Sequence, residues 1–283
     1  MRIFVIIDQD MEKKILCSTG TIVGKANGFD HTLIYRYGGE IAADGYELMM
    51  LKAYYDDLAG LHKTLERSPL PVYTVHFEKD LTFLLGLGNE EDRKEGLRLL
   101  TANADIAQSL GVHSAVFHLW DGRFDRQHLQ KSIDFLETLF EICDQRSVEL
   151  LIENVPCRIS PYESVLNIAE KYPRAGFTFD TRHADFIGET DRFFASELWK
   201  TRVRHIHVSD HCGLTVPGMW GVTRPILHPG EGKIDFERLF DAMPVYDGDT
   251  VTLESPVMRS DGTHDLDRLN RTLSFLHNKV KKY

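Results

Sequence analysis

Short runs of β-branched and aromatic residues alternate along the chain with longer segments whose apolar residues recur every three or four positions. The short runs are typical of buried β-strands, and the longer spacing puts apolar residues on one face of an α-helix. Regular alternation of the two predicts βα units and a parallel sheet. Strands are expected at residues 14–19, 46–51, 72–77, 112–120, 148–155, 176–183, 203–210 and 250–257.

Eight strands separated by helices predict an α/β fold of the (β/α)₈ TIM-barrel type. Amphipathic helices are expected at residues 51–66, 90–110, 127–146, 161–171, 234–242 and 265–280. Ser160 and Pro161 support the start of the fourth helix, because serine caps free N–H groups and proline fits a first turn. The apolar run at residues 3–8 would be an extra strand or hairpin that covers the barrel bottom.

Length and composition agree with a globular barrel. The 283 residues contain no linker or low-complexity stretch, so one domain over residues 1–283 is expected, with a loop insertion at about 211–232. No apolar run is long enough to cross a membrane. The four cysteines form no CxxC pair, which makes a cytoplasmic setting the default. The net charge of −10 disfavours nucleic acid as a partner, and homo-oligomerisation is left open.

Candidate chemistry lies at the C-terminal ends of the strands, because these ends converge on one mouth of a barrel. The last six predicted strands offer His76, His118, Glu153, Asp180 with His183, His207 and Glu254. A lone residue of this kind is usually a solvated or hydrogen-bonded bystander. Independent accidents would not, however, place three carboxylates and one imidazole at matching ends of four consecutive strands. We therefore predict a divalent-metal site formed by Glu153, Asp180, His207 and Glu254.

The ligand set also limits the metal. Three carboxylates and one imidazole suit Mn²⁺, Mg²⁺ or Co²⁺, whereas additional histidines would shift the preference toward Zn²⁺. Apolar residues precede both glutamates, so each would stand above a dry barrel core where its charge requires a cation. His205 points to the same face as His207 one layer deeper, and we interpret it as a core or supporting residue.

Other residues near the mouth are candidates for substrate contact. His183 follows Asp180 by three residues and could face a substrate oxygen. His76 and His118 could line the pocket or pack as hydrogen-bonded histidines. Glu47, near the end of the second strand, is a weaker candidate because exposed glutamates are common.

The stretch at residues 211–232 is rich in glycine and proline and is expected to form a lid over the mouth. Met219 and Trp220 could cover an apolar face of a substrate there, or Trp220 could only anchor the loop to the barrel. Arg224 and His228 could reach polar groups of a bound molecule.

A family resemblance rests on the segments YELMML, TVHF, FHLW, LIENVP, FDTRHAD, HIHVSD, HPGEGKIDF and TLES, which occur in this order. With them the chain resembles the xylose isomerase-like TIM-barrel superfamily of sugar isomerases, epimerases and endonuclease IV. The resemblance implies that Glu153, Asp180, His207 and Glu254 are shared metal ligands. In the ketose epimerase branch the two glutamates also form the acid/base pair, and the histidine of the DTRH segment, here His183, touches the substrate.

The endonuclease IV branch implies a different activity. That branch holds three zinc ions with additional residues that match His76, His118, His183 and His228. Its third zinc also needs an aspartate at the position of Ile226, so the trinuclear site is incomplete in this chain. A zinc phosphodiesterase acting on abasic DNA is therefore the alternative to a sugar enzyme.

The leading hypothesis is a metal-dependent isomerase or epimerase of a sugar, sugar acid or sugar phosphate. The metal would acidify a C–H beside a carbonyl, one glutamate would remove the proton, and the other would protonate the resulting cis-enediolate. An inosose dehydratase-like lyase would share the first step, and the sequence does not separate the two reactions. A non-enzymatic metal- or sugar-binding barrel is disfavoured, because both glutamates and the other two ligands are present together.

Overall fold

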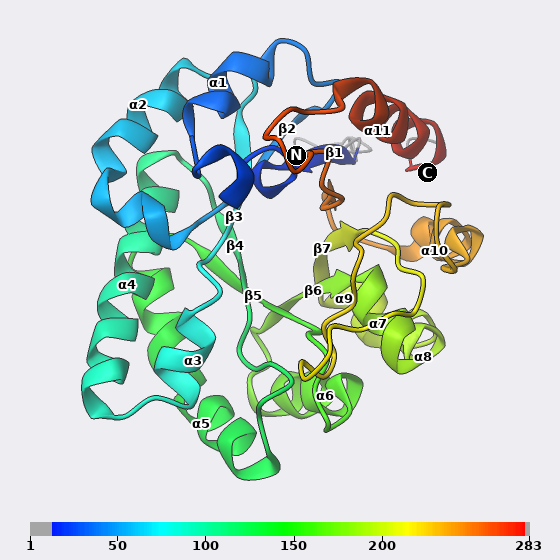
Figure 1. The fold of residues 1–283 in the computed structure, drawn as a ribbon. Coiled ribbons are helices and arrows are strands. Elements are labelled where there is room, and N and C mark those ends of the chain that lie inside the picture. The colour runs from blue at the N-terminus through cyan, green and yellow to red at the C-terminus, as the bar shows by residue number, and fades with distance from the viewer. Residues whose placement is uncertain (1–12, 281–283) are drawn as a thin grey trace, which may run out of the picture.

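Eight parallel strands close into a barrel in chain order in the computed structural model, which describes residues 13–280. The ring is closed by pairing of the first strand with the last, where Ile15 lies opposite Val251. Figure 1 shows the strands inside a ring of helices. The strands are β1 (Lys14–Ser18), β2 (Gly45–Met49), β3 (Val72–His76), β4 (Ser114–Phe117), β5 (Glu149–Glu153), β6 (Gly176–Asp180), β7 (Val203–Val208) and β8 (Thr250–Leu253).

Helices follow the strands along the chain and cover the outside of the barrel. The α-helices are α1 (Thr32–Gly38), α2 (Leu58–Arg67), α3 (Leu81–Gly86), α4 (Glu90–Ser109), α5 (Arg126–Asp144), α6 (Pro161–Lys171), α7 (Thr181–Ile187), α8 (Thr190–Phe194), α9 (Glu197–Thr201), α10 (Phe236–Ala242) and α11 (Leu266–Val280). Short 3₁₀ helices are η1 (Thr19–Thr21), η2 (Lys25–Asn27), η3 (Lys52–Asp56) and η4 (Met243–Val245).

The predicted barrel is confirmed, with all eight strands at the expected places. The strand ends differ, because β4 stops at Phe117 and β6 stops at Asp180, where the aspartate side chain caps α7. The expected helix at 51–66 is divided into η3 and α2, since Asp57 caps a new helix start by accepting a hydrogen bond from the Gly60 amide. Helices α1, α3, α7, α8 and α9 are too short for a 3.6-residue periodicity to predict them. The expected element at residues 3–8 lies outside the described residues.

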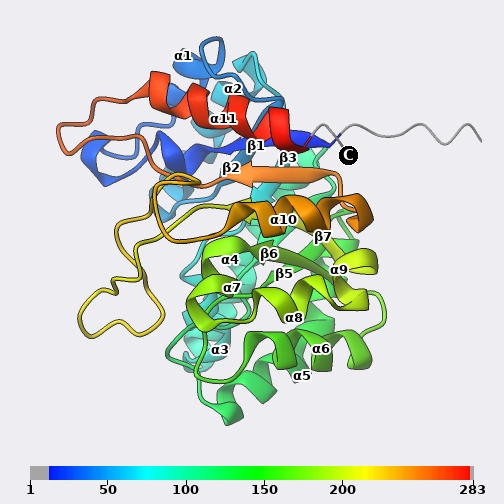
Figure 2. The same cartoon turned by 90° about the vertical axis from the view of Figure 1, so that its right-hand side faces the viewer.

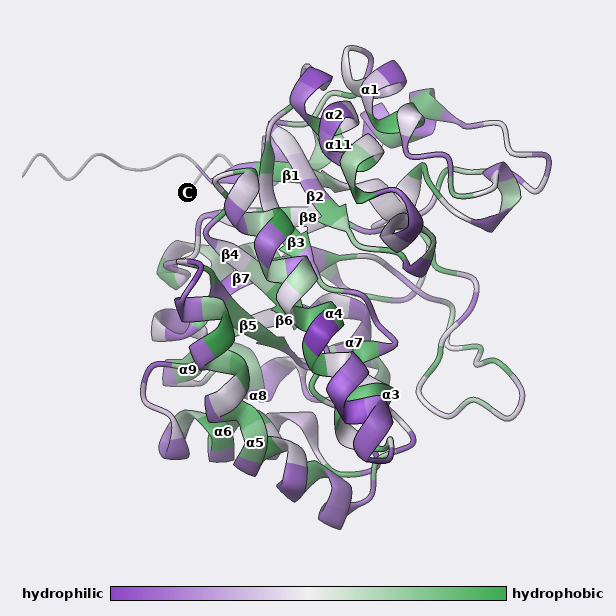
Figure 3. Ribbon diagram, turned by 90° about the vertical axis from the view of Figure 1, so that its left-hand side faces the viewer, coloured by the Kyte–Doolittle hydropathy of each residue, from purple (hydrophilic) through white to green (hydrophobic). Residues whose placement is uncertain are grey.

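Buried apolar side chains of the strands and of the surrounding helices hold the barrel together. Strand residues such as Ile15, Phe179 and Ile206 are fully buried, and Leu269 and Leu273 of α11 pack toward the barrel with no exposed surface. In Figure 3 the helices around the barrel combine hydrophobic (green) and hydrophilic (purple) stretches, as expected for helices with one buried face. No helix of the described residues is long and apolar enough to span a bilayer.

The segment at residues 211–232 extends beyond the C-terminal ends of the strands (Figure 2, yellow). Its two ends are held together by a bridge between Asp210 and Leu227, and the Asp210 carboxylate accepts hydrogen bonds from the amides of Gly230, Gly232 and Ile234. Asp210 therefore closes the base of this loop. The loop carries exposed apolar side chains, including Met219 (54% exposed) and Trp220 (42% exposed).

Candidate metal centre

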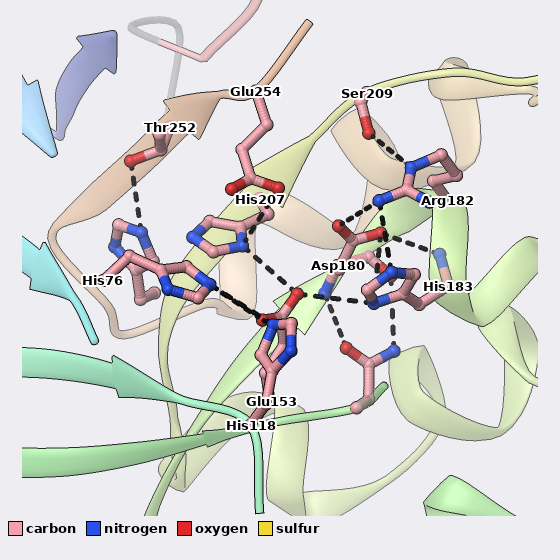
Figure 4. Close-up of polar contacts among 12 residues, drawn as sticks. His76, His118, Glu153, Asp180, Arg182, His183, His207, Ser209, Thr252 and Glu254 are labelled. Atoms are coloured by element: carbon pink, nitrogen blue, oxygen red, sulfur yellow. Dashed lines mark hydrogen bonds and ion pairs between the residues drawn. The ribbon is translucent and has the colours of Figure 1, made fainter. Parts of the chain in front are cut away.

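Four side chains meet at the C-terminal ends of the last four strands, as expected. Glu153 and Asp180 are the final residues of β5 and β6, His207 lies near the end of β7, and Glu254 directly follows β8. Asp180 is paired in register with His207, which brings the two side chains to the same level of the barrel. Ligand atoms of all four residues lie within 4.8 Å of one another. His207 Nδ1 is 3.3 Å from Glu153 Oε1 and 3.5 Å from Glu254 Oε2 (Figure 4).

The burial of this cluster indicates a cation. Asp180 and His207 have no exposed surface, and Glu153 is 1% exposed. Within residues 13–280, neither Asp180 Oδ2 nor Glu254 Oε1 has a hydrogen-bond partner. Arg182 lies 3.7 Å from Asp180 Oδ2 and His207 lies 3.5 Å from Glu254 Oε2, so three carboxylates share few positive charges in this cluster. A buried carboxylate that is not fully compensated costs on the order of several kcal/mol. A divalent ion would remove this cost, and a set of carboxylate oxygens with one imidazole nitrogen fits such an ion.

Glu47 orients the imidazole of the cluster. Its Oε2 atom lies 2.8 Å from Nε2 of both His205 and His207, and all three residues are completely buried in the barrel interior. Because Nε2 of His207 donates to Glu47, Nδ1 is the atom that faces Glu153 and Glu254. Burial disfavours an imidazolium, but the charges of Glu254, Glu47 and Glu153 raise the pKa of His207 well above its usual value.

Glu47 is buried, whereas the sequence analysis treated it as a weak candidate for substrate contact near the mouth, because many glutamates are exposed. Glu47 lies below the cluster and does not line the pocket above it. The reason is the register of β2, which pairs Glu47 with Ser18 and Thr74 and turns its side chain toward the histidines of β7.

A second group of ligand-type atoms adjoins the first. His118 Nε2 lies 2.6 Å from Glu153 Oε2, and His76 Nε2 lies 3.5 Å from the same oxygen. Glu153 thus directs one oxygen toward His207 and the other toward these two histidines. Burial outweighs the attraction of Glu153 and lowers the pKa of His118 to about 3, which leaves its imidazole neutral.

The turn from β6 into α7 brings three functional groups together. Asp180 Oδ1 accepts a hydrogen bond of 2.7 Å from the His183 amide, and Asn154 donates to the Asp180 carbonyl and accepts from its amide. Arg182 donates to Nε2 of His183 at 3.1 Å. Nδ1 of His183 therefore carries the proton, and this atom lies 3.3 Å from Glu153 Oε1.

A cavity of about 570 Å³ opens above the cluster. Of the residues expected to contact substrate, His118, His183, Trp220 and Arg224 line it, together with Glu254 of the cluster. His76 lies beneath His118 and does not line it. Lys79 and Arg182 also line the cavity and are not among the residues predicted from the sequence. Their positions, three residues after His76 and two after Asp180, are the only sequence signal for them.

His228 does not join the pocket, although it was expected to reach a bound molecule. Its Nδ1 atom lies 2.7 Å from the hydroxyl of Thr272 in α11, and burial lowers its pKa. The neighbouring Ile226 lines the cavity with an apolar side chain. The position of Ile226 therefore offers no carboxylate to a metal ion. Nδ1 of His228 is hydrogen-bonded to α11, on the outside of the barrel.

Comparisons with known proteins support the architecture. The family model described as "Xylose isomerase-like TIM barrel" matches residues 38–278. A comparison with curated protein sequences gave no match.

Solved structures of the same fold include sugar epimerases and a dehydratase. D-Allulose 3-epimerase from Methylomonas sp. has a TM-score of 0.72 and 17% identity, covering 95% of this chain and 98% of that one. The IOLI protein, solved with a bound zinc atom, has a TM-score of 0.70 and 15% identity over 95% of this chain and 99% of that one. The probable 3-DHS dehydratase AsbF from Bacillus anthracis has a TM-score of 0.69 and 16% identity, covering 94% and 99% of the two chains.

Proposed function

The chain belongs to the xylose isomerase-like TIM-barrel family, and we propose that it is a divalent-metal-dependent isomerase or epimerase of a sugar, sugar acid or sugar phosphate. The observation that carries the proposal is the position of Glu153 and Glu254. These two carboxylates belong to one buried ligand cluster, and Glu254 also lines a cavity large enough for a sugar. Structures named as sugar epimerases share the fold, which supports this class of reaction.

The bound metal would polarise a carbonyl and the adjacent hydroxyl of the substrate, and so acidify the C–H between them. Glu254 is suited to take up this proton, because its Oε1 accepts no hydrogen bond from residues 13–280 and the residue lines the cavity. Glu153, at the other side of the cluster, would return a proton to the enediolate. The N–H of His183 next to Glu153 would donate to a substrate oxygen that gains negative charge.

Deuterium exchange tests this chemistry without knowledge of the natural substrate. Ketoses, sugar phosphates and inososes would be incubated in D₂O with the enzyme and Mn²⁺ or Co²⁺, and the metal would be removed before NMR. At least one compound should gain deuterium next to its carbonyl. Glu153→Gln and Glu254→Gln should reduce this exchange by several orders of magnitude, and His183→Ala by about 10²-fold.

A matched control is Glu149→Gln, at the opposite end of β5 from Glu153, which should exchange at the normal rate. Undiminished conversion in the Glu153 and Glu254 variants would refute the two-glutamate mechanism, even if both variants still bound metal normally.

A dehydratase is the second candidate, because the structure named as a probable 3-DHS dehydratase shares the fold. Such a lyase would begin with the same proton abstraction and then expel water. The NMR spectra of the exchange experiment separate the two reactions, since a lyase product contains a new carbon–carbon double bond. The cytoplasmic location and the oligomeric state of the protein stay predictions.

A further inference from the structure

Three cationic side chains line the cavity of a chain whose net charge is −10. Lys79 follows β3, Arg182 lies in the first turn of α7, and Arg224 belongs to the loop at residues 211–232. They come from three separate parts of the sequence and meet at one cavity. A surplus of cations at this one place in an acidic protein requires a physical explanation.

Arg182 is held rigidly, yet it keeps free donors. Its Nε donates to the Ser209 hydroxyl at 3.1 Å and its Nη2 to His183 at 3.1 Å (Figure 4). Its Nη1 donates to the Thr223 hydroxyl at 3.1 Å. A guanidinium has five N–H groups, so two remain without a hydrogen bond to the described residues. The nearest carboxylate oxygen, Oδ2 of Asp180, is 3.7 Å from Nη2, which is too far for a hydrogen bond.

Arg224 approaches the same point from the loop. Its Nη1 donates to the carbonyl of Thr223 at 3.2 Å, so the two arginines contact the same residue. Partial burial and the like charge of Arg182 lower the pKa of Arg224. In the described part of the chain, neither Arg224 nor Lys79 forms an ion pair with a carboxylate. Arg182 has one distant counter-ion, Asp180 Oδ2 at 3.7 Å, and Arg224 has none among the described residues. The two guanidinium groups therefore repel each other, and an anion between them would reduce that repulsion.

The carboxylates that line the cavity already have other partners. Asp121 forms a bidentate ion pair with Arg123, and Glu254 belongs to the metal cluster beside His207. Neither is positioned to neutralise the two arginines. Apart from the 3.7 Å contact between Asp180 and Arg182, no carboxylate of the described residues pairs with the two arginines, and a bound anion would supply the missing partner.

We infer that Arg182 and Arg224, with Lys79 at the edge of the cavity, form a subsite for an anionic group, so that the substrate is a carbohydrate bearing a carboxylate or a phosphate. This inference rests on the proposed function and narrows it, because it excludes neutral sugars as the preferred substrates. The bidentate geometry of a guanidinium matches both kinds of anion.

Binding measurements test the subsite without requiring turnover. Isothermal titration calorimetry on the Mn²⁺-loaded protein would compare D-glucose with D-glucuronate, and D-fructose with D-fructose 6-phosphate. The anionic member of at least one pair should bind about tenfold or more tightly than the neutral one, as expected for one charge-assisted contact. Preference within the first pair identifies a carboxylate site, and preference within the second identifies a phosphate site.

Two variants and a control assign the preference to these residues. Arg224→Gln should reduce the affinity for the anion about tenfold and leave that for the neutral sugar unchanged. Arg182→Lys should also reduce the affinity for the anion, because a lysine keeps the charge but loses the fork of donors. It also loses the hydrogen bond to His183, so Arg224→Gln is the variant that isolates the anion contact. Arg36→Gln, an equal charge change on the exposed surface of α1, should have no effect. Since Arg224 lies exposed at the edge of the cavity, its replacement does not disturb the core.

The inference is overturned if no pair shows a preference for the anion, including the case in which nothing binds, or if the preference survives in Arg224→Gln. The binding measurements and the deuterium exchange distinguish failure of the subsite from failure of the proposed function. An anion preference without deuterium exchange in any compound would retain the subsite and refute the isomerase. Deuterium exchange in a neutral sugar, without a preference for anions, would support the isomerase and refute the anion subsite.

Discussion

Oε2 of Glu47 lies 2.8 Å from Nε2 of His207 and accepts its hydrogen bond inside the closed barrel. This contact determines which nitrogen of His207 faces the other three ligand residues. Glu47 itself contributes no atom to that cluster of four. In the proposed function it would act through His207, as a carboxylate that fixes the orientation and basicity of a histidine that binds the metal.

Replacing Glu47 by glutamine should weaken Mn²⁺ binding by about 10–100-fold, the usual effect of losing such a supporting carboxylate. Glutamine has nearly the same shape, so the barrel should still fold, but it lacks the charge that holds the His207 N–H. Competition with a chromogenic chelator measures the affinity. Glu149→Gln, at the opposite end of the barrel, is the matched control and should bind Mn²⁺ normally. Unchanged affinity in Glu47→Gln would show that the hydrogen bond does not support a ligand.

Protein purified without a chelator should carry about one divalent ion, and either Glu153→Gln or Asp180→Asn should sharply reduce its occupancy. The reason is the loss of a negative charge at the buried cluster. Elemental analysis gives the metal content. Asp235→Asn is a suitable control, because Asp235 also caps a helix, α10, but lies outside the cluster. Full occupancy after replacement of all four ligands would disprove the assignment.

An oligonucleotide with one abasic site should remain essentially intact when incubated with the protein and Zn²⁺. The position that would need an aspartate is Ile226, and His228 does not line the cavity above the cluster. Gel electrophoresis detects strand cleavage. Rapid, metal-dependent nicking that disappears in Glu254→Gln would make the nuclease the better explanation of the site.

The number and order of the strands could be predicted because each strand is a separate apolar run, and chain order is the spatial order in this barrel. The meeting of Glu153 and Asp180 with His207 could be predicted for the same reason, since strand ends share one mouth. The direction of Glu47 could not, because β2 is apolar on both sides of this residue and its inward face depends on register with neighbouring strands. The turn of His228 toward α11 also depends on a contact 44 positions away in the sequence.

Asp180 both caps α7 and belongs to the buried cluster with Glu153, His207 and Glu254, and Arg182 and His183 lie in the first turn of this helix. Each helical residue rotates its side chain by about 100° around the axis. Insertion of one residue directly after Asp180 would therefore turn the guanidinium and the imidazole away from the cavity together. A substitution at either position would keep this geometry and could change specificity. A change in the length of this segment would instead remove the cap, the cluster residue and both cavity side chains at once.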